Sequence, residues 1–168
     1  MERAIYWIDT PLRGRLAVVA RPRGADHVSM LKAAGVDTLV SLLEPDEAVE
    51  VGLAKEADWC AQAGVEFLQL PIADHGVPSG FRMIEGAMLE LAAHLRAGRG
   101  VAAHCYAGLG RSPLLAASVL IHHGWSDGEA IEVVSAARGC MVPEMDTQHL
   151  WLLKFALRCQ SRDSRLNS

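Results

Sequence analysis

Residues 100–113 have the sequence GVAAHCYAGLGRSP, and this stretch decides how the chain folds. Its first five residues form a short run of small and apolar side chains that is typical of a buried β-strand. The residues from Arg111 or Ser112 to His123 have apolar side chains at helical spacing. Pro113 is tolerated there, because its missing N–H would have no partner in the first turn of a helix. We therefore predict a strand, a tight glycine-containing turn and a helix.

The alternation of strands and helices continues on both sides of this stretch. Strands that alternate with helices imply crossover connections. We therefore expect an α/β fold with a central, mostly parallel sheet of about four to five strands, flanked by helices on both faces. In such sheets ligands bind beyond the carboxyl ends of the strands, which here means the turn after His104. Besides the elements above, the patterns predict strands at 16–20, 36–43 and 65–70, and helices at 25–34, 45–63, 81–96, 126–138 and 146–159.

Length and charge exclude several classes of protein. The chain has 168 residues, enough for one domain, which we place at 1–160 and follow with a polar tail at 161–168. Its net charge of −4 argues against a general nucleic-acid binder. The long, largely apolar stretch Leu114–Ile121, interrupted only by Ser118, is too short to cross a membrane, and the first nine residues are too polar for a signal peptide. We expect a monomer that binds neither membranes nor nucleic acid.

The four cysteines form no Cys-x-x-Cys pair, which favours a reducing, cytoplasmic setting. A reduced chain leaves Cys105 free to react. We expect Cys60, Cys140 and Cys159 to be buried thiols, and the sequence leaves open whether one of them pairs with Cys105 on oxidation. No His-Glu-x-x-His motif and no acidic cluster indicates a metal site.

The loop between Cys105 and Arg111 is suited to hold a phosphate monoester. A short turn that leads onto a helix can point successive backbone N–H groups inward, and the helix N-terminus adds partial positive charge. The planar guanidinium of Arg111 matches two phosphate oxygens. Glycine permits the close approach and the positive φ angles that such a turn needs. The five residues between are Tyr106, Ala107, Gly108, Leu109 and Gly110.

Cys105 is the candidate nucleophile of this loop. A thiol beside a helix N-terminus and a guanidinium ionises readily, and the thiolate is the reactive form. Ser112 is placed to donate its hydroxyl to that sulfur, while His104 is expected to face away from the ligand and support the loop. A lone cysteine before a turn is usually a small buried hydrophobe. The complete Cys-x5-Arg-Ser pattern favours the catalytic interpretation.

The sequence His104–Ser112 resembles the active-site loop of the cysteine-dependent protein tyrosine and dual-specificity phosphatases. It is most similar to the compact dual-specificity branch that includes the kinase-associated phosphatases, and the resemblance extends from about Leu16 to Phe155. It implies a phosphotyrosine protein phosphatase-like fold and a phosphocysteine intermediate formed without a metal or other cofactor. It also implies phosphorylated proteins as substrates, with phosphotyrosine first and phosphoserine or phosphothreonine as further candidates.

The resemblance assigns two more residues. The family's general acid is an aspartate about thirty residues before the cysteine, and Asp74 lies 31 residues before Cys105 after a predicted strand. Asp146 and Glu144 are weaker candidates. The family also uses a glutamine to position the hydrolytic water, a role that Gln148 would fill unless it is a surface residue of its helix.

Several alternatives remain open at this stage. The chain is shorter than the classical tyrosine-specific domains, which predicts a shallower site, and the loop lacks the lysines typical of phosphoinositide phosphatases. A phosphatase for a non-protein ester, a phosphoprotein-binding pseudophosphatase and a sulfurtransferase or arsenate reductase are the rivals. An arginine cluster near the N-terminus is either a solvated basic edge or a second anion site for an acidic phosphopeptide. Its members are Arg13, Arg15, Arg21 and Arg23.

Overall fold

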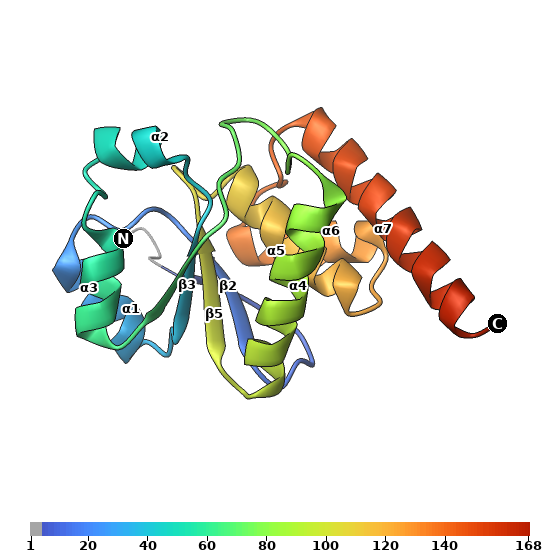
Figure 1. Cartoon of the computed structure of the whole chain (residues 1–168), viewed down its shortest axis with the longest axis horizontal. Coiled ribbons are helices and arrows are strands. Elements are labelled where there is room, and N and C mark those ends of the chain that lie inside the picture. The colour runs from blue at the N-terminus through green and yellow to red at the C-terminus, as the bar shows by residue number, and fades with distance from the viewer. Residues whose placement is uncertain (1–4) are drawn as a thin grey trace.

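A five-stranded sheet lies between two groups of helices in the computed structural model, which describes residues 5–168 (Figure 1). The strand order is β1-β2-β5-β3-β4, and every neighbouring pair is parallel except β1 with β2. The expected mostly parallel α/β sheet is therefore confirmed. The strands are β1 (Ile5–Ile8), β2 (Arg15–Val19), β3 (Thr38–Ser41), β4 (Glu66–Gln69) and β5 (Gly100–His104).

The helices lie on both sides of this sheet (Figure 1). One side carries α1, α2 and α3, and the other carries α4 to α7. Because successive strand residues point to opposite faces, Val101 and Ala103 of β5 join the core under α4–α7, whereas Ala102 joins the core under α1 and α3. The helices are α1 (Ala25–Ala33), α2 (Pro45–Glu50), α3 (Glu56–Ala63), α4 (Phe81–Arg96), α5 (Arg111–His122), α6 (Asp127–Arg138) and α7 (Asp146–Leu166).

Three elements differ from the prediction. The edge strand β1 was not predicted, because four residues, three of them half-exposed, that pair only with β2 give too short a pattern. The helix predicted at 45–63 is two helices, since the chain turns at Gly52, whose φ is +81°. The last helix ends at Leu166 rather than at residue 159, so the polar residues of the predicted tail continue α7 as exposed helix.

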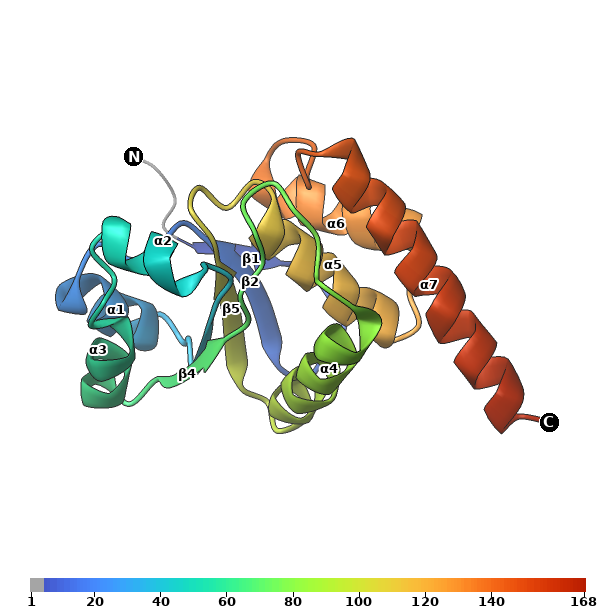
Figure 2. The ribbon, with the colours of Figure 1, turned by 45° about the horizontal axis from the view of Figure 1, so that its top comes forward.

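The four parallel strands bring the loops that follow them to the carboxyl edge of the sheet. β5 lies between β2 and β3, with β4 beyond β3, and Figure 2 shows the loops after β4 and β5 side by side. Within residues 5–168, no helix has the length and apolar character of a membrane-spanning segment.

Candidate active site

A cavity of about 330 Å³ opens at this edge of the sheet. Cys105 lies in its wall and is only 3% exposed, so the sulfur can be reached from the cavity but hardly from elsewhere. Carboxylates and a guanidinium share the same wall. The lining residues are Asp74, His75, Cys105, Tyr106, Ala107, Leu109, Gly110, Arg111 and Glu144.

Cys105 and Ser112 contact each other as the spacing predicts. The Sγ atom lies 3.3 Å from the Ser112 hydroxyl oxygen, and Ser112 is fully buried in the first turn of α5. A hydroxyl in this position can donate to a thiolate. The contact therefore suits a sulfur that must carry negative charge.

The backbone of residues 105–111, the Cys105 loop, curls tightly onto α5. Gly108 has a φ of +73°, and a Cβ there would lie 3.2 Å from the carbonyl oxygen of Val19. A Cβ on Gly110 would lie 3.2 Å from atoms of both Gln148 and Glu144. A larger residue at Gly108 would be strained by the positive φ and crowded by a backbone oxygen, whereas at Gly110 the side-chain ends of Gln148 and Glu144 would have to shift by a few tenths of an ångström.

Arg138 supports the Cys105 loop from outside, a role the sequence did not suggest. Its Nε donates to the carbonyl of Gly108 at 3.0 Å and its Nη2 to that of Ala107 at 3.3 Å, while its guanidinium lies 4.2 Å from the centre of the Tyr6 ring. The N–H groups of residues 106–110 donate to no other described residue. Outward carbonyls and unused N–H groups are what an anion nest requires.

His104 lies behind the loop on the α3 side of the sheet. Its Nε2 lies 2.7 Å from Oε1 of Glu56, and both side chains are buried. Its Nδ1 lies 3.1 Å from the carbonyl oxygen of Cys105. His104 thus holds the backbone at the nucleophile and does not line the cavity, and its partner Glu56 is a residue the sequence did not single out.

Arg111 is held by three acceptors from two other elements. Glu47 of α2 accepts from Nη1 at 2.7 Å and from Nη2 at 2.8 Å. Nη1 also donates to the carbonyl of Ile72 at 3.0 Å. The hydrogen bonds from Arg111 hold the pKa of Glu47 below its usual range. A carboxylate on a separate short helix therefore orients the guanidinium, a partnership no local sequence pattern indicates.

Asp74 also lines the cavity and contacts the same arginine. Its Oδ1 accepts from Nη2 of Arg111 at 3.1 Å and from the N–H of His75 at 3.0 Å, and its side chain is 61% exposed. Of the weaker acid candidates, Glu144 lines the cavity, whereas Asp146 is an exposed residue at the start of α7. The structure thus brings Asp74 and Glu144 to Cys105, and leaves Asp146 outside.

Gln148 is fully buried, so the alternative of a surface glutamine is wrong. Its Nε2 donates to the carbonyl of Gly76 at 3.0 Å, and its Oε1 accepts from the N–H of Met145 at 3.3 Å. Gln148 therefore ties the loop that carries Asp74 to the start of α7. It lies beside Gly110 and is not among the lining residues of the cavity.

The N-terminal arginines do not form one cluster. Arg13 and Arg15 lie at the amino end of β2, and Arg21 and Arg23 follow its carboxyl end. Arg15 lies over the Trp7 ring at 3.7 Å, and Arg21 lies over the Tyr106 ring at 3.9 Å. The strand separates Arg13 and Arg15 from Arg21, which contacts a residue that lines the cavity.

The other cysteines differ in their surroundings. Cys60 is buried on the α1 and α3 side of the sheet, and burial raises the pKa of its thiol to about 12. Cys159 is half-buried, and burial also raises its pKa. Cys140 is exposed, so the expectation that all three are buried was wrong for this residue. Among the described residues, none of the three lines the cavity with Cys105.

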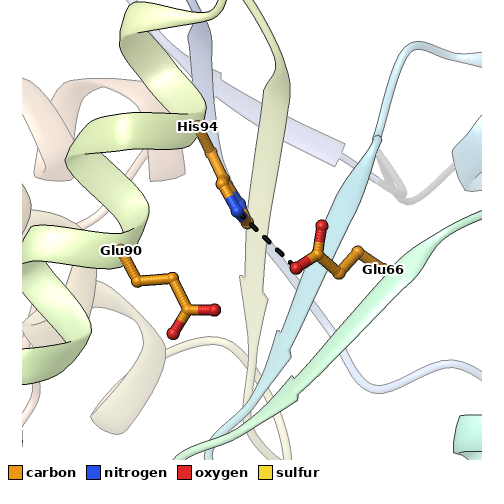
Figure 3. Close-up of side chains that lie close together, drawn as sticks. All are labelled: Glu66, Glu90 and His94. Atoms are coloured by element: carbon orange, nitrogen blue, oxygen red, sulfur yellow. Dashed lines mark ion pairs between the residues drawn. The ribbon is translucent and has the colours of Figure 1, made fainter.

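One group of side chains has the composition of a metal site. Glu66 of β4 and Glu90 and His94 of α4 each offer a ligand atom, and these atoms lie within 4.8 Å of one another (Figure 3). Glu66 already pairs with Arg99 at 2.7 Å and with His94 at 3.6 Å, while the buried Thr38 hydroxyl lies 3.0 Å from His94 Nδ1. Glu66 and His94 are therefore already engaged in ion pairs at the amino ends of the strands, and none of the three residues lines the cavity.

The chain is similar to known phosphatases over most of its length. The family model "Polymorphic toxin system, DSP-PTPase phosphatase" matches residues 18–125. Cyclin-dependent kinase inhibitor 3 of Homo sapiens is 31% identical over 144 residues, which are 82% of this chain and 68% of the relative. Phosphatidylglycerophosphatase and protein-tyrosine phosphatase 1 of Mus musculus is 32% identical over 126 residues, 67% of this chain and 65% of the relative. The chain thus spans about two thirds of these relatives.

Solved structures agree with the sequence relatives. The crystal structure of kinase associated phosphatase, with its catalytic-site cysteine replaced by serine, has a TM-score of 0.85 at 25% identity and covers 93% of this chain and 95% of that chain. The crystal structure of the active form of Tk-PTP has a TM-score of 0.74 at 28% identity, and the match covers 92% of this chain and 96% of that chain. With its sheet, its Cys105 loop and these likenesses, the chain belongs to the dual-specificity and protein-tyrosine phosphatases, enzymes that hydrolyse phosphate monoesters.

Proposed function

We propose that this enzyme removes phosphate from phosphorylated proteins, with Cys105 as nucleophile and Asp74 as general acid and base. The observation that carries the proposal is the cavity in which the sulfur of Cys105, the guanidinium of Arg111 and the carboxylate of Asp74 meet. Phosphotyrosine is the first candidate substrate, and phosphoserine and phosphothreonine follow. A phosphate ester that is not on a protein is the second candidate, because the mouse relative's name includes phosphatidylglycerophosphatase.

The first chemical step forms a sulfur–phosphorus bond. The Cys105 thiolate attacks phosphorus in line with the leaving oxygen, the phosphorus–oxygen bond breaks, and protonated Asp74 gives its proton to that oxygen. Negative charge on the three other oxygens is stabilised by Arg111 and by the unused N–H groups of residues 106–110.

The second step returns the enzyme to its starting state. A water molecule attacks phosphorus, Asp74 takes its proton, and the sulfur–phosphorus bond breaks to release phosphate and the thiolate. The Ser112 hydroxyl, 3.3 Å from the sulfur, stabilises the charge that returns to Cys105. We propose that Gln148 serves this step indirectly, by holding the loop of Asp74 through its hydrogen bond to the Gly76 carbonyl.

Arg111 and Asp74 must separate when phosphate enters. All four Nη hydrogens of Arg111 are used, two by Glu47 and one each by Ile72 and Asp74, so only the Nε hydrogen is free of described partners. Two-pronged binding of phosphate requires Nη2 to exchange Asp74 for a phosphate oxygen. The carboxyl group of Asp74 is then free to turn toward the leaving group.

The reactive thiol of Cys105 bears on the cellular compartment in which the enzyme can work. We propose that it works as a monomer in a reducing compartment, the cytoplasm, because a reactive thiol must stay reduced and all four cysteines are free. The cavity draws every lining residue from one chain. We place the catalytic domain at residues 1–160 and regard the exposed end of α7 at 161–168 as dispensable for chemistry.

Substitution of Cys105 tests the chemistry directly. Wild-type protein, assayed with chelator present, is expected to release phosphate from p-nitrophenyl phosphate and from phosphotyrosine and phosphothreonine peptides, with vanadate as a competitor. The Cys105→Ser variant should lose turnover by at least about 10³-fold while keeping the wild-type melting temperature. Cys140→Ser, which changes an exposed thiol outside the cavity, is the matched control. Retained turnover in Cys105→Ser would refute the nucleophile, and phosphopeptide binding without release by wild type would identify a binding module.

A further inference from the structure

We propose that Arg21 is a specificity-determining residue that selects phosphopeptides carrying an acidic side chain next to the phosphorylated residue. The inference rests on the proposed phosphoprotein function and adds a substrate class to it. Arg21 follows β2 at the carboxyl edge of the sheet, beside the Cys105 loop. It does not touch the reacting atoms, so its effect is on which substrates bind.

Arg21 packs against Tyr106, a residue that lines the cavity. Its guanidinium lies 3.9 Å from the centre of the Tyr106 ring, and its Nη1 donates to the Tyr106 carbonyl at 3.4 Å. Tyr106 is the residue after the nucleophile, lines the cavity and is 49% exposed. A stacked guanidinium has lost part of its side-chain freedom, so a ligand need not order it again.

Most hydrogen-bond donors of Arg21 are unused. A guanidinium has five N–H groups, and in the described part of the chain only one of those on Arg21 finds an acceptor. No carboxylate among residues 5–168 forms an ion pair with it, in contrast to Arg111, Arg99 and Arg158. A guanidinium that is held in place and has unused N–H groups can donate to both oxygens of a carboxylate.

Other residues that line the cavity carry the reverse charge. Asp74 and Glu144 line it with side chains 61% and 41% exposed, and Asp74 follows β4, which lies beyond β5 and β3 from β2 in the sheet. An acidic side chain of a bound peptide is therefore attracted by Arg21 and repelled by these two carboxylates. A headgroup with several phosphates would meet these carboxylates, and the five residues within the Cys105 loop include no lysine to receive it. The charges therefore favour a single carboxylate of a peptide over a phosphoinositide.

The experiment compares matched phosphotyrosine peptides that have aspartate or alanine beside the phosphotyrosine. For wild type, kcat/KM for the acidic peptide is expected to exceed that for the neutral peptide about fivefold, and added salt should reduce this ratio. Arg21→Ala should bring the ratio to about one, and Arg21→Lys should keep part of it. Arg13→Ala makes the same charge change at the other end of β2 and should keep the wild-type ratio. Melting temperatures check that each variant is folded.

The outcomes separate this inference from the function on which it rests. Equal rates on both peptides, or a ratio that survives Arg21→Ala, would overturn the role of Arg21 and leave the phosphoprotein function standing. Failure of wild type to release phosphate from either peptide would overturn both. A third assay uses vesicles that contain a phosphoinositide. If the wild type hydrolyses that lipid in preference to the peptides, and Arg21→Ala loses this preference, Arg21 binds a lipid phosphate and the peptide inference is contradicted.

Discussion

Glu47 and Arg111 are 64 positions apart, yet their contact prepares the site. An arginine has many rotamers, and phosphate binding is weakened if the guanidinium must be ordered at that moment. Two hydrogen bonds from Glu47 fix its plane beforehand, and because Glu47 is only 20% exposed, water competes weakly for them. At the residue scale, the geometry of the anion site therefore depends on a carboxylate outside the Cys105 loop.

Glu47→Gln should weaken catalysis and change the response to acid. A glutamine accepts with one oxygen only, so Arg111 is held less firmly and kcat/KM for an aryl phosphate should fall about tenfold. The pKa of Glu47 is lowered in the folded protein, so its contribution to stability is present above its unfolded pKa and disappears as pH falls through the folded pKa.

Urea unfolding at about pH 6 and about pH 3 measures this contribution, and Glu47→Gln should lose less unfolding free energy over that range than wild type does. Glu50→Gln, an exposed position of the same helix, is the control. An equal acid-dependent loss in Glu47→Gln and wild type would show that the Arg111 pair contributes nothing to stability.

At the scale of elements, the strand–turn–helix unit from β5 to α5 makes the anion site. The strand ends at His104, the turn reverses within six residues, and α5 begins at Arg111 with its N–H groups toward the cavity edge. Gly108 is needed because the backbone there is in the left-handed region and packs against Val19 of β2. The turn therefore depends on its neighbouring strand as well as on its own residues.

Gly108→Ala should damage both stability and activity. A positive φ costs a residue with a Cβ about 1 kcal/mol or more, and the new Cβ would also press on the Val19 carbonyl. Gly124→Ala has a similar φ of +97° with nothing within 4 Å, so it should lose comparable stability and keep its kcat/KM. For Gly108→Ala, we expect kcat/KM on an aryl phosphate to fall more than tenfold. Full activity in this variant would mean that the loop does not need its close contact with β2.

The whole molecule brings together groups that are far apart in the chain. Asp74 follows β4 at the edge of the sheet, Arg111 begins α5, and Gln148 of α7 ties down the loop of Asp74. Because β3, β4 and β5 are parallel, the loops after them open at one edge. Acid, nucleophile and anion site therefore meet through the sheet topology.

The variant Asp74→Asn tests whether Asp74 is the general acid, because the need for an acid depends on the leaving group of the substrate. Without the acid, phenyl and alkyl phosphates should react about 10²-fold more slowly, whereas an ester with a good leaving group should be much less affected. Vanadate binding should persist, because Nη2 of Arg111 no longer has a charged competitor. Asp146→Asn is the control outside the cavity. Equal losses on all esters would contradict the acid role, and the same leaving-group signature in Glu144→Gln would transfer that role to Glu144.

Residues that are neighbours along the chain account for the parts of the site that could be predicted. The apolar run of residues 100–104, the two glycines and the helical pattern after Arg111 predict the strand, the turn and the helix, because each depends on local backbone preferences and burial. The spacing of Cys105, Arg111 and Ser112 likewise sets their proximity within one turn.

The packing of the folded chain selects the distant groups that surround them. Glu47 and Arg138 reach the Cys105 loop from two separate helices, and Glu56 of a third helix contacts His104 directly before it. The burial of Gln148 and the contact of Arg21 with Tyr106 also depend on how the helices and loops pack. The physical reason is that a charge or hydrogen bond acts through space, so its partner is chosen by packing and sheet order and leaves no local pattern in the chain.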